Sequence, residues 1–128
     1  MEKQIDSKTL AIEIAKILDG KKAQDVRVLK VEDLTVLTDY FVIASGTSTT
    51  QVAALADEVD YQLSQRGIKP YNTEGFDSKN WVLLDYSSVI VHVFVPNTRT
   101  YYDLEHLWAD AETVDVSQWL TEPEEDNQ

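Results

Sequence analysis

The chain of 128 residues contains no cysteine and two histidines. Without thiols it forms no disulfide, offers no thiolate nucleophile and holds no zinc ion through sulfur. Two histidines are too few for a histidine-rich metal cluster. Long apolar runs are also lacking, because no segment approaches the roughly 20 residues of a membrane span. The first residues have no signal-peptide core. We therefore expect a soluble, cytoplasmic protein with no membrane contact.

Basic residues are scarce. The chain has 11 Lys and Arg against 23 Asp and Glu, a formal net charge of −12. Phosphate contacts need Lys and Arg, so no direct, sequence-specific nucleic acid binding is expected. A protein of this charge that works near RNA should contact a basic protein there. Acidity that only maintains solubility is the simpler explanation, and it is favoured for the C-terminal residues.

Short apolar strands and amphipathic helices alternate along the chain. Helices are predicted over about 7–20, 49–66 and 99–109, and strands over 25–31, 40–44, 81–86 and 89–95. The last two strands form a hairpin whose second member, apolar on both faces, should be central. The helix between the second and third strands favours a parallel crossover. This order predicts one α/β (α+β) domain over 1–120, with a mixed β-sheet covered by helices, and a disordered acidic tail over 121–128.

A turn around Gly46 joins the strand over 40–44 to the next helix. Such turns often bind phosphate in α/β proteins. Phosphate loops usually have more glycines and a following lysine, which this turn lacks. Ser48 and Gln51 instead have the spacing of a capping box. We favour a capped structural turn, and a phosphate site is the alternative.

Nucleotidyl transfer is the enzymatic alternative, because a strand, a Gly/Ser turn and a helix resemble that fold. Its chemistry needs two metal ions held by carboxylates on neighbouring strands. Asp85 is the one carboxylate in the strands over 81–86 and 89–95. His92 stands alone among apolar neighbours, which is more typical of a core or edge histidine than of a base. We predict no catalytic residue, no metal ligand and no enzyme activity.

The aromatic residues have two interpretations, as core or as anchors of a protein interface. Trp81 opens a strand after a polar loop, and Tyr102 lies beside the apolar stripe of Tyr101, Leu104 and Trp108 on the last helix. These two side chains are expected to be the most exposed. For Leu104, Leu107 and Trp108 we favour the core.

Several segments together resemble the ribosome silencing factor (Iojap-like) family, and the likeness runs from about residue 10 to 108. They are DYFVIASGTSTTQVAALADEV (39–59), Glu74-Gly75, WVLLDY (81–86), VIVHVF (89–94) and RTYYDLEHLW (99–108). The resemblance implies a nucleotidyltransferase-like fold without catalytic carboxylates and without a cofactor. It also implies a translational repressor that binds the large ribosomal subunit through universal protein fourteen. The bound factor blocks joining of the subunits, and free members are often homodimers.

The family match and the expected exposure together predict a partner-binding surface. It consists of Trp81, Leu83, Asp85, Tyr102 and Glu105. The first two would be apolar anchors on one strand face, and Asp85 on that face would pair with a basic residue. One departure is Ser87-Ser88 where the family usually has Gly-Asp, because serine tolerates a positive φ poorly. An adaptor for another partner is a further alternative.

Overall fold

The computed structural model describes residues 5–120, so the predicted acidic tail over 121–128 lies outside the described residues. The helical elements are α1 (Ser7–Gly20), α2 (Thr49–Ser64), α3 (Pro96–Tyr102), α4 (Leu104–Leu107) and the short 3₁₀ turn η1 (Ser117–Trp119). The strands are β1 (Gln24–Lys30), β2 (Tyr40–Ser45), β3 (Asn72–Glu74), β4 (Trp81–Asp85), β5 (Val89–Phe94) and β6 (Glu112–Val114). Within this range no helix is long and apolar enough to cross a membrane.

One six-stranded sheet, in the order β3-β4-β5-β2-β1-β6, forms the centre of the molecule. Its β2–β5 pair is parallel and the other pairs are antiparallel, which confirms the mixed sheet. The central position predicted for β5 is also confirmed. The prediction that β2 and β4 form a parallel pair through the crossover is wrong, because the parallel partner of β2 is β5. Since β5 is apolar on both faces, it takes the buried place beside β2 and leaves β4 nearer the edge.

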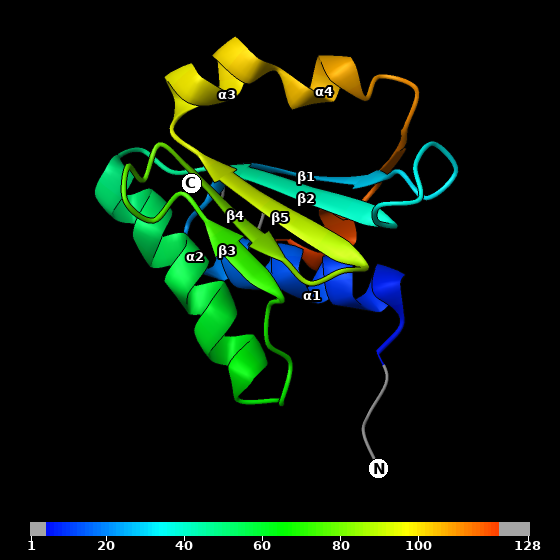
Figure 1. The fold of residues 1–128 in the computed structure, drawn as a ribbon, viewed down its shortest axis with the longest axis horizontal. Coiled ribbons are helices and arrows are strands. Elements are labelled where there is room, and N and C mark those ends of the chain that lie inside the picture. The colour runs from blue at the N-terminus through cyan, green and yellow to red at the C-terminus, as the bar shows by residue number, and fades with distance from the viewer. Residues whose placement is uncertain (1–4, 121–128) are drawn as a thin grey trace.

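One face of the sheet is covered by α1 and α2 (Figure 1). The strands alternate, so every second side chain points to these helices. In β5 these are Val89, Val91 and Val93, all fully buried. The predicted α1 and α2 stripes lie in this core, and Ser48 caps α2 as expected by accepting from the Gln51 N–H (3.1 Å). The N-cap of α1 is Asp6, whose carboxylate accepts from the Thr9 N–H (3.2 Å).

Of the residues that the structure describes, those of the α3–α4 segment cover the opposite face (Figure 1). The single helix predicted over 99–109 is wrong, because the helix is interrupted at Asp103, whose φ is +49°. A left-handed residue changes the direction of the helix axis, so the stripe expected from one continuous helix is interrupted. Tyr101 is consequently 82% exposed and Leu107 71% exposed, which contradicts the apolar face and core position predicted for them.

Two edge strands were not predicted. The polar loop before β4 forms β3, and the segment after α4 forms β6, which pairs with β1. Each strand has three residues and little apolar character, so neither has the alternation from which strands are recognised. The C-terminal segment does fold back onto the body, where Val116 is buried.

Candidate partner-binding surface

The alternation of β4 places Trp81, Leu83 and Asp85 on the same side of the sheet as α3. All three are partly buried, while Val82 and Leu84 between them are fully buried in the α1–α2 core. The predicted grouping of the three residues on one strand face therefore agrees with the structure. Because β4 is covered on this side by little more than α3, their side chains remain accessible.

Trp81 and Tyr102 lie side by side at the centre of this surface. Their ring centroids are 4.7 Å apart, and the Trp81 ring also stacks on Phe94 at 4.8 Å. Tyr102 in turn meets Tyr101 edge to face at 5.0 Å. An open groove of about 590 Å³ lies here, and its lining residues are Ser78, Asn80, Trp81, Asn97, Thr98, Tyr101 and Tyr102. We call it the aromatic groove. An open groove with aromatic walls and a polar rim is typical of protein-binding surfaces.

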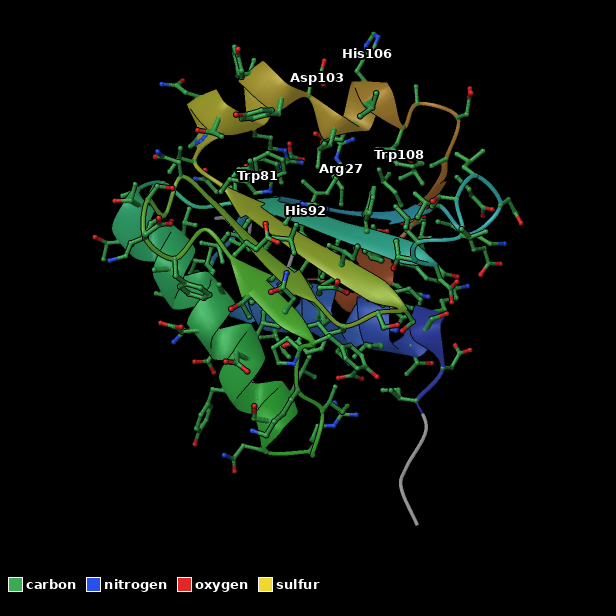
Figure 2. All side chains as sticks on the ribbon, in the orientation of Figure 1. Arg27, Trp81, His92, Asp103, His106 and Trp108 are labelled. Atoms are coloured by element: carbon green, nitrogen blue, oxygen red, sulfur yellow. The ribbon has the colours of Figure 1, made fainter. Side chains whose placement is uncertain are left out.

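His92 lies directly beneath Trp81. Its Nδ1 accepts a hydrogen bond from the Trp81 indole N–H (3.1 Å), and Figure 2 shows both residues on the α3 side of the molecule. The His92 ring also meets Phe41 edge to face at 5.0 Å. Burial lowers the pKa of His92 to about 4, so the imidazole is neutral near pH 7. The prediction of a core histidine agrees with this burial, but its bond to Trp81 was not foreseen.

Asp85 stabilises the β4–β5 turn. Its Oδ1 accepts from the Ser87 N–H (2.8 Å), and Ser87 has the positive φ (+74°) that the serine substitution had placed in question. One carboxylate oxygen is thus used within the chain.

Glu105 does not line the aromatic groove. Its carboxylate accepts from Arg99 Nη2 (2.6 Å) and Nε (3.3 Å), and Arg99 Nη1 donates to Ser45 Oγ (2.8 Å). Arg99 Nη2 also lies 3.5 Å from Asp25 Oδ2. This ion cluster borders a separate groove of about 410 Å³ at the end of β2. Glu105 therefore holds α4 to α3 and the sheet.

The role of Arg99 was not predicted from the sequence. An arginine six residues before a glutamate is not a helical pair, so the spacing carried no signal. Only the break at Asp103 brings the two together.

The N–H groups of Gly46 and Thr47 in the turn are hydrogen-bonded within the chain. The Thr47 N–H and hydroxyl both bind Gln51 Oε1, and the Gly46 N–H donates to the Phe94 carbonyl (2.9 Å). A Cβ on Gly46 would meet Val52 N at 3.0 Å, so α2 packs closely on the turn. Among residues 5–120, no group of three or more His, Asp or Glu residues could hold a metal ion. The favoured structural turn fits this geometry better than a phosphate site.

Fold and surface together define a single-domain α/β protein with a mixed sheet and an aromatic groove beside α3. The family model described as ribosomal silencing factor during starvation matches residues 4–128. The ribosomal silencing factor of Bacillus subtilis is 44% identical over 98 residues, which are 77% of this chain and 83% of the relative. This chain belongs to the ribosomal silencing factor family. The family predicted from the sequence is thereby confirmed.

Two further relatives extend the comparison. A crystal structure of a Chromobacterium violaceum protein has a TM-score of 0.79 at 35% identity, covering 82% of this chain and 88% of that one. The mouse protein named mitochondrial assembly of ribosomal large subunit protein 1 is 36% identical over 98 residues, 74% of this chain and 43% of its own length. The predicted fold class is confirmed, and the matched family is one of ribosome-associated regulators.

Proposed function

We propose that this protein is a translational repressor that binds the large ribosomal subunit and blocks its joining with the small subunit. The contact is made with universal protein fourteen through Trp81, Leu83, Asp85 and Tyr102. The observation that carries this proposal is the aromatic groove, where Trp81 and two exposed tyrosines line one open surface. The name of the mouse relative, which refers to the ribosomal large subunit, supports the choice of subunit.

Charge supports a basic protein as the partner. The chain carries a formal net charge of −12, which attracts basic protein surfaces and is repelled by neighbouring RNA. The carboxylate of Asp85, which lies on the same face of β4 as Trp81, suits one Lys or Arg of the partner. Glu105 contributes indirectly, because its ion pair with Arg99 holds the α3–α4 segment that carries Tyr102.

The mechanism is steric and needs no catalysis. A factor bound where the small subunit must dock competes with it by occupancy. The alternative, a nucleotidyltransferase-type enzyme, is less well supported, because Asp85 is the one carboxylate in β4 and β5 and caps a turn there. Tight binding of Mg²⁺ and a nucleotide would favour the enzyme over the repressor.

Co-sedimentation tests the proposal. The full chain is sedimented with purified large subunits, and small subunits are then added. We expect co-sedimentation and a reduced yield of joined ribosomes. Trp81→Ala should weaken binding about 30-fold or more, as truncation of a buried aromatic anchor does. Tyr61→Ala is the control, because Tyr61 is an exposed tyrosine on α2, away from the groove. The proposal would be wrong if the protein failed to co-sediment with large subunits, or if the two subunits joined unhindered in its presence.

Two related predictions accompany the proposal. The free protein is expected to be a homodimer, and light scattering during size-exclusion chromatography measures its mass directly. It is expected in the cytoplasm with the ribosomes on which it acts, and fractionation followed by immunodetection tests this location.

A further inference from the structure

The indole of Trp81 contacts Phe94, Tyr102 and His92. The ring centroids of Phe94 and Tyr102 lie 4.8 and 4.7 Å from that of Trp81, and neither ring contact is a directed bond. The hydrogen bond to His92 is different. Only one orientation directs Nε1–H at the Nδ1 atom of His92, 3.1 Å away. The ring edge opposite Nε1 is consequently turned away from His92.

His92 is a fixed acceptor. It lies on β5 in the centre of the sheet, where Leu83 and Ile43 are its neighbours on the flanking strands. The residue is 5% exposed, and Phe41 packs edge to face against its ring. Neither its backbone nor its ring can follow a movement of the indole. The orientation of Trp81 is therefore imposed by His92 and not the reverse.

Packing alone does not explain an imidazole at this place. Since Nδ1 accepts from Trp81, the proton of the neutral ring is on Nε2. Nε2 has no hydrogen-bond partner among the residues that the structure describes, and it is fully buried. A buried donor without a partner is destabilising, whereas a leucine would fill the same apolar site without that cost. What the imidazole adds is an acceptor for the indole, and burial keeps it neutral by lowering its pKa.

We propose that His92 is a positioning residue for partner binding, which selects one orientation of the Trp81 indole and presents a pre-organised aromatic wall to the partner in the groove. This inference rests on the proposed function, because the partner is the basic large-subunit protein. A side chain that is ordered before binding loses less conformational freedom in the complex, so the hydrogen bond improves affinity without His92 touching the partner.

Nuclear magnetic resonance of the wild-type protein tests the geometry directly. In ¹⁵N-labelled full-length protein at pH 7, a scalar coupling should cross the hydrogen bond from Trp81 Nε1 to His92 Nδ1. The three tryptophans give three indole N–H signals, and Trp81→Phe identifies the one that belongs to Trp81. Its hydrogen exchange should be slow. No coupling, or a proton on Nδ1, overturns the inference.

Two variants of His92 connect the geometry to binding. His92→Leu removes the acceptor, and His92→Asn places Oδ1 near the position of Nδ1. We expect His92→Leu to accelerate exchange of the Trp81 indole proton and to weaken binding to large subunits about fivefold. His92→Asn should restore both properties. In a Trp81→Phe background, which has no indole N–H, His92→Leu should cause no further loss. An equal loss in both backgrounds overturns the inference.

Failure of the two proposals gives different results. If Trp81→Ala binds large subunits as tightly as wild type, the proposed contact surface is wrong, and His92 loses its role in binding although the coupling persists. If Trp81→Ala loses binding but His92→Leu retains both binding and a slow indole proton, the inference about His92 is wrong and the proposed function stands. Matched spectra of the backbone amides verify that each variant is folded.

Discussion

The two faces of the sheet differ in how they are covered. The face under α1 and α2 has long amphipathic helices and fully buried aliphatic side chains such as Val91 and Leu55. The face under α3 and α4 has two short helical pieces over a smaller cluster, in which aromatic rings pack around Phe41 and Phe94. Figure 2 shows Trp81 and Trp108 on this second side. The first face supplies stability, and the second leaves apolar and aromatic side chains accessible to a partner.

The polar groups differ in the same way. The α1–α2 side holds the buried Tyr86, whose pKa is raised by burial and which stays neutral near pH 7. The α3–α4 side holds His92 and the Arg99 ion cluster. Buried polar groups contribute little net stability, but the directed bonds that they make favour one geometry. The second face is therefore specified mainly by directed bonds.

The largest expected effect tests whether stability is concentrated on the first face. Leu55→Ala removes a fully buried side chain from the α1–α2 core and should lower the free energy of unfolding by about 3 kcal/mol. Leu107→Ala is the control, because Leu107 is mostly exposed on α4 and should change stability by less than about 0.5 kcal/mol. Urea unfolding followed by circular dichroism measures both. Similar losses in the two variants would contradict the comparison.

The second effect concerns pH. Burial lowers the pKa of His92 to about 4 from a usual value of 6.5, so between these values the unfolded chain binds a proton that the folded chain does not. Stability from this group is complete above pH 6.5 and decreases as pH falls, by up to about 3 kcal/mol near pH 4.

Unfolding of wild type and His92→Leu between pH 7 and pH 4 measures this difference. Carboxylates titrate in both proteins and cancel when the two curves are subtracted. The difference should be flat above pH 6.5 and should change steadily below it. Parallel curves over the whole range would show that His92 is not protonated preferentially in the unfolded chain.

The third effect concerns the attachment of α3 and α4. Glu105→Ala removes two hydrogen bonds from Arg99 (2.6 and 3.3 Å) and leaves that guanidinium with Ser45 and Asp25. Because Glu105 is partly exposed, we expect a loss of about 2 kcal/mol, below that of a fully buried pair. Hydrogen exchange should accelerate in α3 and α4 before α1 and α2.

Glu13→Ala is the matched control for that prediction. Glu13 on α1 pairs with Lys16 and Arg66 at 3.8 and 3.7 Å, and both partners are exposed. Surface pairs of this kind contribute at most about 1 kcal/mol. If Glu105→Ala behaved like Glu13→Ala, the ion cluster would not be what holds the second face in place.

The same contrast explains what could be predicted from sequence. The helices α1 and α2 have strong helical periodicity, and the central strands β2 and β5 are continuous apolar runs. The predicted bounds of these four elements are within two residues of those observed. The second face depends on the interruption of the helix at Asp103, which has a positive φ. A glycine there would have indicated the end of a helix, but aspartate also adopts positive φ and gives no such signal. The exposure of Leu107 follows from that interruption.

The candidate surface divides in the same manner. The alternation of β4 was sufficient to place Trp81, Leu83 and Asp85 together, because a strand of known direction fixes its faces. The bond from Trp81 to His92 depends on the register that sets Leu83 opposite His92, and only pairing of the strands determines it. Glu105 was assigned to the surface from the family match, whereas its distances show an internal ion pair.

The smallest expected effect lies in the β4–β5 turn, which belongs to both faces. Ser87 has a φ of +74°, and the Ser88 N–H donates to the Tyr86 carbonyl (2.9 Å) across it. Ser87→Gly relieves this backbone strain but makes the unfolded chain more flexible, so we expect a net gain of about 0.5 kcal/mol. Thermal unfolding measures the gain.

Ser88→Gly is the control for this turn, because Ser88 has no positive φ to relieve. It should lower the free energy of unfolding by about 0.5 kcal/mol, since glycine adds only flexibility to the unfolded chain. Binding to large subunits should be unchanged in both variants, because the turn stabilises the two faces equally. If Ser87→Gly raises and Ser88→Gly lowers the free energy of unfolding while both variants bind equally well, the turn contributes to the stability of the sheet and not to binding at the aromatic groove. A loss of binding in Ser87→Gly would instead show that the turn itself belongs to the contact surface, next to Asp85.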